Sequence, residues 1–364
     1  MLRLITGIAM LMGAVTAQST EMQWLEGQLR PFKTDQAFIQ SYTDRSQSYL
    51  YDQALAIIAF SRSGDHVRAK QLVKTLETVQ NPDGTWYFSY YLDGKSPHPS
   101  EGDMRPHGAI AWAALAVLTY EKESKDRSFQ NVWKNSLTHL EKNIVFIPRL
   151  KQHGLRFSSV DNKKTKWNER EVAALEHALD GVAAFRLAFI LSADKRWEKS
   201  QKQLEDFSVG LWDEVDGHFW SGVNMLTGKI NRSEFYLDNQ SWSVLALSHL
   251  PLKEKFQSAL QASCRLSVVS GNRRGFSESR SPASQQEFIW SEGTAGKALA
   301  LSLQQGQCGD TKASHYMETL ESMKITGGVQ YVDRPQVPDF SDSPSVAGTV
   351  WTWFLRHRIN PLGV

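Results

Sequence analysis

Two kinds of segment alternate along the chain, one apolar on all sides and one with a single apolar stripe. Segments of the first kind begin near Tyr51, His107, Glu176, Leu237, Trp290 and Ser345. Successive starts lie roughly 50 to 70 residues apart, the length of a repeat that contains two helices and their loops. The pattern therefore predicts six helical hairpins.

The apolar segments are predicted to be inner helices. Residues 51–60 and 108–118 have almost no polar face, and a helix that is apolar all round has to be buried all round. Small residues such as Gly181, Gly293 and Gly296 let neighbouring backbones approach closely. We expect the six apolar helices to form a crowded inner ring.

The striped segments are predicted to be outer helices. In residues 66–80, Leu72, Val73 and Leu76 share one helical face and charged side chains occupy the other. The same pattern recurs in residues 129–143, 196–212, 253–268 and 313–324. The sixth outer helix is expected from the N-terminal part of the chain, at either 22–29 or 34–42.

The loops that lead from an outer helix to the next inner helix are the long ones. Residues 85–91, 217–221 and 328–332 within them are aromatic or β-branched and are predicted to form short β-hairpins. Long loops on one face of a repeat architecture usually carry the binding site. We therefore expect the site at the N-terminal ends of the inner helices.

The N-terminus has the features of a secretory signal peptide. Residues 1–17 contain one charge, Arg3, then an apolar run and small residues before Gln18. The run is shorter than the about 20 residues that span a bilayer; an uncleaved anchor is the alternative. No linker divides residues 18–364, so we expect one domain. We expect the cleaved protein to be periplasmic or secreted, monomeric and free of the membrane.

Charge and motif content restrict the partners. The chain has 41 basic and 39 acidic residues, a net charge of +2, which gives no footprint for nucleic acid or an anionic membrane. No nucleotide, phosphate or metal motif occurs, so no cofactor and no metal are expected.

The predicted helices separate Cys264 and Cys308 by roughly 25 Å, and a disulfide needs Cα atoms within about 7 Å. We therefore expect no disulfide.

Three short strings carry a resemblance to a known superfamily. They are Tyr-Asp-x-Ala-Leu-Ala from Tyr51, Glu-His at Glu176, and Trp-x-Glu-Gly-Thr-Ala from Trp290. With them the chain resembles exported bacterial members of the six-hairpin glycosidase superfamily. The resemblance implies an all-α (α/α)6 toroid with inner and outer helix rings, and a carbohydrate cleft at the inner-helix starts. The superfamily contains hydrolases, lyases and epimerases with differently placed catalytic groups, so the resemblance assigns no catalytic residue.

Carboxylates gather at the predicted inner-helix starts. Breaking a glycosidic bond takes a proton donor and a second carboxylate on the opposite side of the sugar. The candidates for this pair are Glu292, Asp180, Glu176 and Asp238. Glu176 and Asp180 share one helix face, where like charges raise a pKa. The alternative is that the aspartates cap helices or bond to neighbours.

Other polar and aromatic residues near these starts are candidates for binding substrate. Flat aromatic rings suit the CH faces of sugars, although most of the 12 tryptophans are expected in the core. A histidine such as His177 is more often structural than a base, and an ion pair with Asp103 or Glu101 is the alternative role for Arg105. The candidates are Asp52, Trp86, Tyr91, Asp103, Arg105, His107, His177, Trp220, Trp242 and Trp290.

Three functions stay open at this point. The first hypothesis is a glycoside hydrolase that acts on an extracytoplasmic oligo- or polysaccharide, with Glu292 and one of the other three acids as the catalytic pair. The second is a polysaccharide lyase or sugar epimerase, for which Arg105, His107 and Tyr236 are the candidates. The third is a non-catalytic glycan-binding factor of exopolysaccharide metabolism. Two carboxylates about 5 to 10 Å apart across the cleft favour hydrolysis.

Overall fold

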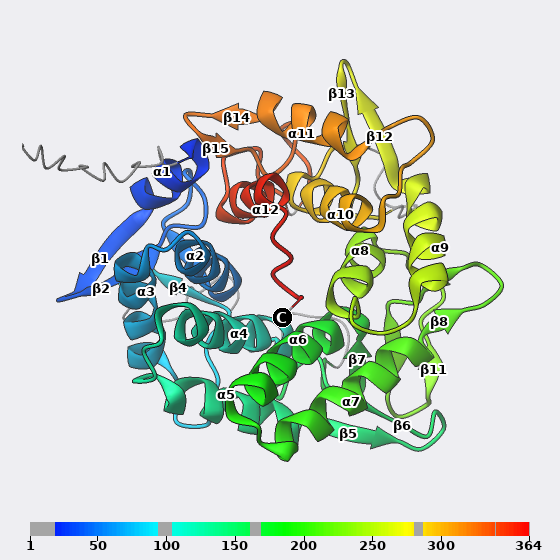
Figure 1. The fold of residues 1–364 in the computed structure, drawn as a ribbon, viewed down its shortest axis with the longest axis horizontal. Coiled ribbons are helices and arrows are strands. Elements are labelled where there is room, and N and C mark those ends of the chain that lie inside the picture. Colours follow the sequence, from blue (N-terminus) through cyan, green and yellow to red (C-terminus); the bar gives the residue numbers. More distant parts are fainter. Residues whose placement is uncertain (1–18, 94–103, 161–168, 280–286, 339, 364) are drawn as a thin grey trace, which may run out of the picture.

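Six inner helices form a closed ring (Figure 1). The computed structural model describes residues 19–93, 104–160, 169–279, 287–338 and 340–363. Every predicted inner helix is present, and its start differs from the prediction by at most one residue. The inner helices are α2 (Leu50–Arg62), α4 (His107–Ser124), α6 (Leu175–Ser192), α8 (Leu237–Ala246), α10 (Ser291–Gln304) and α12 (Val346–His357).

A second layer of helices surrounds the inner ring. These outer helices are α1 (Thr20–Gly27), α3 (His66–Val79), α5 (Gln130–Lys142), α7 (Lys195–Gly210), α9 (Lys253–Ser263) and α11 (Ala313–Ser322). Of the two N-terminal alternatives, the first segment is the helix, whereas residues 36–39 form a strand. The predicted all-α (α/α)6 toroid is confirmed.

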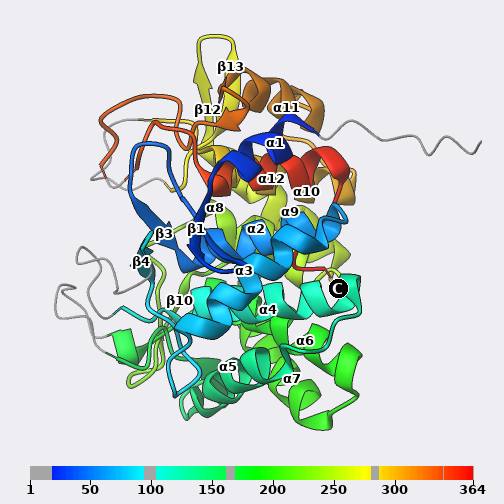
Figure 2. The same cartoon turned by 90° about the vertical axis from the view of Figure 1, so that its left-hand side faces the viewer.

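Short antiparallel strand pairs lie in the long loops. Residues 218–219 and 328–329 belong to short hairpins as predicted, whereas residues 89–91 pair with the distant residues 47–49. A three-stranded sheet in the order β11-β10-β7 is the largest of them. Figure 2 shows β3, β4 and β10 together at one end of the ring and the C-terminus at the other. The strands are β1 (Leu29–Lys33), β2 (Gln36–Ile39), β3 (Gln47–Tyr49), β4 (Ser89–Tyr91), β5 (Ile144–Ile147), β6 (Gln152–Leu155), β7 (Val172–Ala174), β8 (Trp212–Asp213), β9 (His218–Phe219), β10 (Gly222–Asn224), β11 (Lys229–Ile230), β12 (Ser267–Ser270), β13 (Arg273–Phe276), β14 (Lys324–Ile325) and β15 (Gly328–Val329).

The inner ring closes where α12 packs against α2, and the outer helix α1 packs against α12 beside this point. We call the ion-paired residues between α1 and the last hairpin the seam. Glu21 of α1 is 2% exposed. Its Oε1 accepts hydrogen bonds from Lys324 Nζ and Arg356 Nε, both at 2.9 Å. Arg356 also pairs with Glu321 of α11. The first helix of the chain is thereby joined to the last hairpin.

The prediction that Cys264 and Cys308 stay apart is wrong. They form a disulfide, with Cα atoms 5.5 Å apart. The predicted outer helix ran to residue 268, but α9 ends at Ser263 and is followed by a 3-10 turn and β12. The chain also reverses after α10, where Gln305 has a φ of 54°. This reversal returns Cys308 to the end of α9.

Within the described ranges, no helix has both the length and the apolar character that crossing a membrane takes. The predicted signal segment, residues 1–17, lies outside those ranges.

Candidate active site

The four predicted catalytic acids lie at the N-terminal ends of three inner helices. Glu176 and Asp180 occupy the first two turns of α6, and Asp238 and Glu292 the first turns of α8 and α10. None of these helices has a side-chain N-cap. The ring therefore brings acids that are far apart in sequence to one end, which we call the mouth.

Burial and mutual repulsion hold protons on the two acids of α6. The pKa of Glu176 is raised well above its ordinary value, first by burial and then by the charges of Asp238 and Glu292. Burial likewise raises the pKa of Asp180, and the charge of Glu176 raises it further. Like charges in a poorly solvated site cannot all ionise.

Asp238 ionises more easily than Asp52 and Glu292 at the mouth. Burial raises its pKa to about 6. The backbone N–H of Asn239 opposes this, since it donates to Asp238 Oδ1 at 2.6 Å. Burial therefore raises the pKa of both acids, that of Glu176 well above its ordinary value and that of Asp238 to about 6.

Glu292 is held by two phenols. Tyr51 donates to its Oε1 at 2.6 Å, and Tyr331 donates to its Oε2 at 3.0 Å. Tyr51 in turn accepts the indole N–H of Trp351 at 2.7 Å. Burial raises the pKa of Glu292 to about 8, although the two phenols lower it. The residue is 3% exposed.

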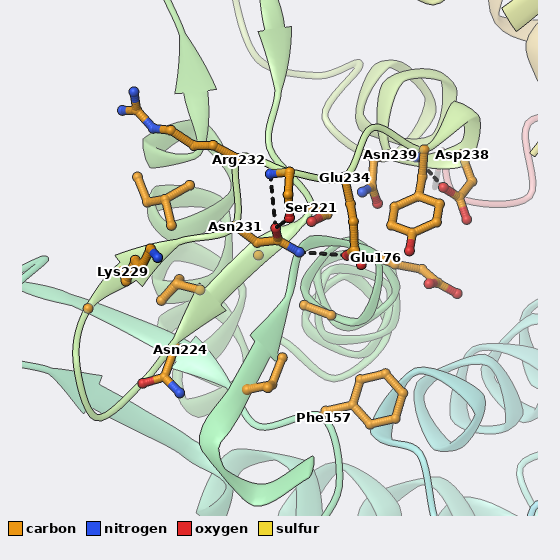
Figure 3. A pocket seen from close by; sticks show the side chains of 18 of the residues that line it. Phe157, Glu176, Ser221, Asn224, Lys229, Asn231, Arg232, Glu234, Asp238 and Asn239 are labelled. Atoms are coloured by element: carbon orange, nitrogen blue, oxygen red, sulfur yellow. Dashed lines mark hydrogen bonds between the residues drawn. The ribbon is translucent and has the colours of Figure 1, made fainter. Parts of the chain in front are cut away.

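A pocket of about 1200 Å³ opens beside the acids (Figure 3). Glu176 and Asp238 line it, whereas Asp180, Glu292 and Asp52 are not among its lining residues. One wall is the sheet of β7, β10 and β11. Figure 3 shows Glu176 and Asp238 at one side and Asn224 and Lys229 at the other. A ligand in this pocket can reach the first two acids directly.

Four aromatic side chains from different inner helices pack close to the acids. Trp242 stacks on Trp351, with ring centroids 5.6 Å apart, and Trp112 meets both edge-on. Tyr51 packs edge-on against Trp112. Trp242 is 4% exposed, so the structure gives this candidate a packing role. Through Tyr51 and Trp112 the cluster contacts Glu292 and Asp180, and it contributes to the burial of these two acids.

Asp52 connects two inner helices. It is 4% exposed, and burial raises its pKa to about 7 against hydrogen bonds from the Ser41 side chain and the Ala347 backbone N–H. Because Ala347 lies in the first turn of α12, Asp52 satisfies an N–H group at the start of that helix. This matches the capping alternative.

The two candidate histidines are buried and neutral. Burial lowers the pKa of His107 to about 3 and that of His177 to about 3. His107 Nδ1 lies 2.6 Å from the carbonyl oxygen of Arg156. His177 stacks on Phe157 with centroids 4.1 Å apart. Neither histidine lines the pocket.

The loop before α4, which contains Asp103 and Arg105, is only partly described. Asp103 and Glu101 lie outside the described residues. Arg105 forms an ion pair with Asp83, in which Nη1 and Oδ2 are 3.2 Å apart. Its guanidinium carbon lies over the Tyr87 ring, 5.0 Å from the ring centroid. Tyr91 ends β4, opposite Gln47 of β3.

The remaining tryptophan candidates, Trp86, Trp220 and Trp290, are all buried. Trp86 is fully buried and donates its indole N–H to the Leu76 carbonyl, so the structure corrects its predicted substrate role to a packing role. Trp220 donates to Asp213 Oδ2 at 2.9 Å. Trp290 packs edge-on against Tyr331, and a Cβ on Gly293 would overlap its ring. The absence of a side chain at Gly293 therefore leaves the space that the Trp290 ring occupies.

Several residues of the site were missed. Tyr331 was seen only as part of a β-hairpin, and Tyr51 only as the start of a string. Asn239 is 3% exposed and lines the pocket. Its position after Asp238 was the one available signal. Among the described residues, no group of three histidines, cysteines or acids has the arrangement of a metal site.

Solved structures with the same fold are sugar-processing proteins. A sugar epimerase from a ruminal bacterium is 12% identical with a TM-score of 0.71, over 93% of this chain and 96% of that chain. A glycosidase variant in complex with glucose is 11% identical with a TM-score of 0.67, over 94% and 95%. A GH76 α-mannanase from Bacteroides thetaiotaomicron is 11% identical with a TM-score of 0.62, over 93% of each chain.

No protein-family model matches the sequence, and no curated protein matches it. The structural likeness spans nearly the whole chain. The chain therefore has the (α/α)6 toroid fold that these structures share, as the helix pattern of the sequence predicted.

Proposed function

We propose that this protein is a glycoside hydrolase that acts on an extracytoplasmic oligo- or polysaccharide through carboxylate acid/base catalysis. One observation carries the proposal: Glu176 and Asp238 line the same pocket, where the pKa of Glu176 is raised well above its ordinary value and the pKa of Asp238 is raised to about 6. Pairs of titratable groups with separated pKa values define acid and base roles. The fold's sugar-processing relatives support a carbohydrate substrate.

Glu176 is the proton donor in this proposal and Asp238 is the base. The bond between the anomeric carbon and the leaving oxygen breaks as Glu176 gives its proton to that oxygen. A water oxygen bonds to the anomeric carbon and loses its proton to Asp238. The two acids then exchange protons with solvent and return to their starting states. Burial and the charges of Asp238 and Glu292 raise the pKa of Glu176, which favours its protonated form.

Glu292 is the rival proton donor, as the sequence suggested. Its pKa of about 8 also keeps it protonated at neutral pH. Both of its oxygens are already hydrogen-bonded to tyrosines, however, and it does not line the pocket. The solved structures of the similar glycosidase include variants that replace a glutamate or a tyrosine. Glu292→Gln therefore belongs in the same experiment.

A sugar epimerase is the second candidate, favoured by the likeness to the epimerase structure. Epimerisation needs a base that removes a proton from carbon. His107 and His177 are unsuited, because both are buried away from the pocket. A lyase needs a cation beside the substrate carboxylate, and Arg105 is already paired with Asp83. Both observations favour hydrolysis.

The test is a panel of plant and bacterial glycans incubated with the mature protein and with Glu176→Gln, Asp238→Asn and Glu292→Gln. New reducing ends that disappear in the first two variants support the assignment. If new reducing ends disappear only in Glu292→Gln, Glu292 rather than Glu176 is the proton donor. Unsaturated products would establish a lyase, an altered sugar without cleavage an epimerase, and binding without products the glycan-binding factor.

We also propose that the chain is exported after removal of residues 1–17. The disulfide between Cys264 and Cys308 supports this, because such bonds persist in oxidising compartments. N-terminal sequencing of the periplasmic and secreted fractions is the test. A mature N-terminus at Gln18 is expected, and retention of residue 1 in the membrane fraction would contradict the proposal.

A further inference from the structure

A second pocket lies at the far end of the ring from the acids. Its volume is about 380 Å³, and it lies between the end of α4, the start of α5 and the end of α6. Glu121 lines it and follows His107 by four turns of α4, which puts it roughly 20 Å from the mouth. Whatever binds there does not contact the catalytic acids.

Four cations line this pocket: Lys122, Lys125, Arg127 and Lys134. None of them pairs with a carboxylate among the residues that the structure describes. Neighbouring cations outside the pocket are paired, such as Arg62 with Glu123 and Lys70 with Asp126. The positive charge is therefore concentrated in the pocket rather than neutralised.

Two further features favour an anion here. The pKa of Lys122 is lowered, first by burial and then by the charge of Arg62, so a bound negative charge would offset an existing repulsion. Helix α5 begins at Gln130 without a side-chain cap from Phe129. Its first N–H groups lie next to the pocket, and free N–H groups at a helix start favour anions.

Glu121 gives the pocket a second kind of polar group. It is 6% exposed, and its Oε2 accepts the indole N–H of Trp133 at 3.1 Å. Its Oε1 is buried and has no partner within the described part of the chain. Burial raises the pKa of this carboxyl. Buried oxygens normally have a hydrogen-bond partner, and the hydroxyl of a ligand can donate the missing hydrogen bond to Oε1.

We propose that this pocket binds an acidic saccharide, with the sugar's carboxylate, phosphate or sulfate on the four cations and a sugar hydroxyl on Glu121. The oxyanion accounts for the unpaired charge, and the hydroxyl accounts for the unpartnered Oε1. The site holds an anionic glycan on the face away from the mouth. It does not depend on the proposed hydrolase activity.

The test uses defined probes and a charge-matched control. Binding of hexagalacturonate, cellohexaose and inorganic phosphate to the mature protein is measured by calorimetry at low and high salt. The test variant is Lys122→Gln/Arg127→Gln/Lys134→Gln. The control, Lys195→Gln/Lys202→Gln/Lys253→Gln, removes the same charge from exposed positions on α7 and α9.

Hexagalacturonate is expected to bind at low salt, to weaken as salt rises, and to bind at least about tenfold more weakly to the test variant, because charge-assisted hydrogen bonds are lost. The control variant is expected to bind normally. No binding at low salt, or equal weakening in both variants, would overturn the proposal. If cellohexaose binds as tightly as hexagalacturonate, the negative charge does not contribute to binding. If phosphate binds as tightly as hexagalacturonate, the sugar does not contribute.

Discussion

Two buried glutamates show how this fold treats the same side chain in opposite ways. Glu21 at the seam and Glu292 at the mouth are 2% and 3% exposed. Burial by itself raises the pKa of each. At the seam, hydrogen bonds from Lys324 and Arg356 outweigh burial and lower the pKa of Glu21 to about 2. At the mouth, the hydrogen bonds from two phenols do not outweigh the effect of burial, and the pKa of Glu292 is raised to about 8.

The difference teaches which acids hold the ring together and which are free for chemistry. An acid that is paired with cations stays ionised and contributes to stability. An acid surrounded by aromatic rings and other acids keeps its proton at neutral pH, and clusters of such perturbed groups are typical of functional sites. Variants at the two places should therefore fail in different assays.

The largest expected effect is on activity, in Glu176→Gln. The amide cannot donate a proton to the leaving oxygen, so kcat on the best glycan of the panel should fall by about 10² to 10⁴. The melting temperature should stay within a few degrees, because the side chain is only partly buried in the pocket. Glu254→Gln, an exposed glutamate in the first turn of α9, is the matched control. Full activity in Glu176→Gln would remove it from the mechanism.

The sequence predicts the ring well because the repeat pattern is local. Each inner helix is apolar all round over two or more turns, and its start is marked by the change from loop to apolar run. The end of α9 was harder to predict, because residues 264–268 are compatible with either helix or strand and packing against β13 decides between them. The wrong prediction for the cysteines followed from that boundary.

The site is less predictable, since its contacts are non-local. The acids at the mouth are visible in the sequence as residue types at helix starts. Nothing local indicates that Tyr51 bonds to Glu292, 241 positions further along the chain. Nor does the sequence separate Trp86, which is fully buried, from a tryptophan in a cleft. Those assignments depend on how six hairpins close around one centre.

The next largest effect is on stability, in Glu21→Gln at the seam. The variant leaves Lys324 and Arg356 beside a neutral amide, although Glu321 still pairs with both. Because the two cations are partly exposed, we expect a loss of about 2 kcal/mol in the free energy of unfolding at pH 7. Urea denaturation measures it, and activity per folded molecule should be unchanged. A loss of activity without a loss of stability would contradict the comparison.

The seam also has a defined pH window. The pKa of Glu21 falls from an ordinary value of 4.5 to about 2 on folding. Its contribution is therefore complete above pH 4.5 and is lost as the pH falls toward 2. Glu21→Gln should abolish that part of the acid dependence. An unchanged acid limb in the variant would show that other carboxylates cause it.

Glu292→Gln tests the pH range in which stability falls as the pH rises. The folded pKa of Glu292 is raised from 4.5 to about 8, so the stability that its protonated form provides is complete below pH 4.5 and is lost as the pH rises toward 8. The slope from one group is at most about 1.4 kcal/mol per pH unit. The variant should flatten the decline between pH 5 and 8, measured by urea denaturation. An identical slope would mean that Glu292 is ionised throughout.

The smallest expected effects distinguish the two phenols that hold Glu292. Tyr51→Phe removes a bond of 2.6 Å and also leaves the Trp351 indole N–H, which donates to Tyr51 at 2.7 Å, without its acceptor. Tyr331→Phe removes one bond of 3.0 Å. We expect losses of about 2 kcal/mol and about 1 kcal/mol, since a buried donor left unpaired adds to the cost of the bond itself. Both variants should raise the pKa of Glu292, because each phenol lowers it, and parallel urea denaturation at pH 6 and 8 measures both effects. A larger loss in Tyr331→Phe would mean that Trp351 finds another acceptor.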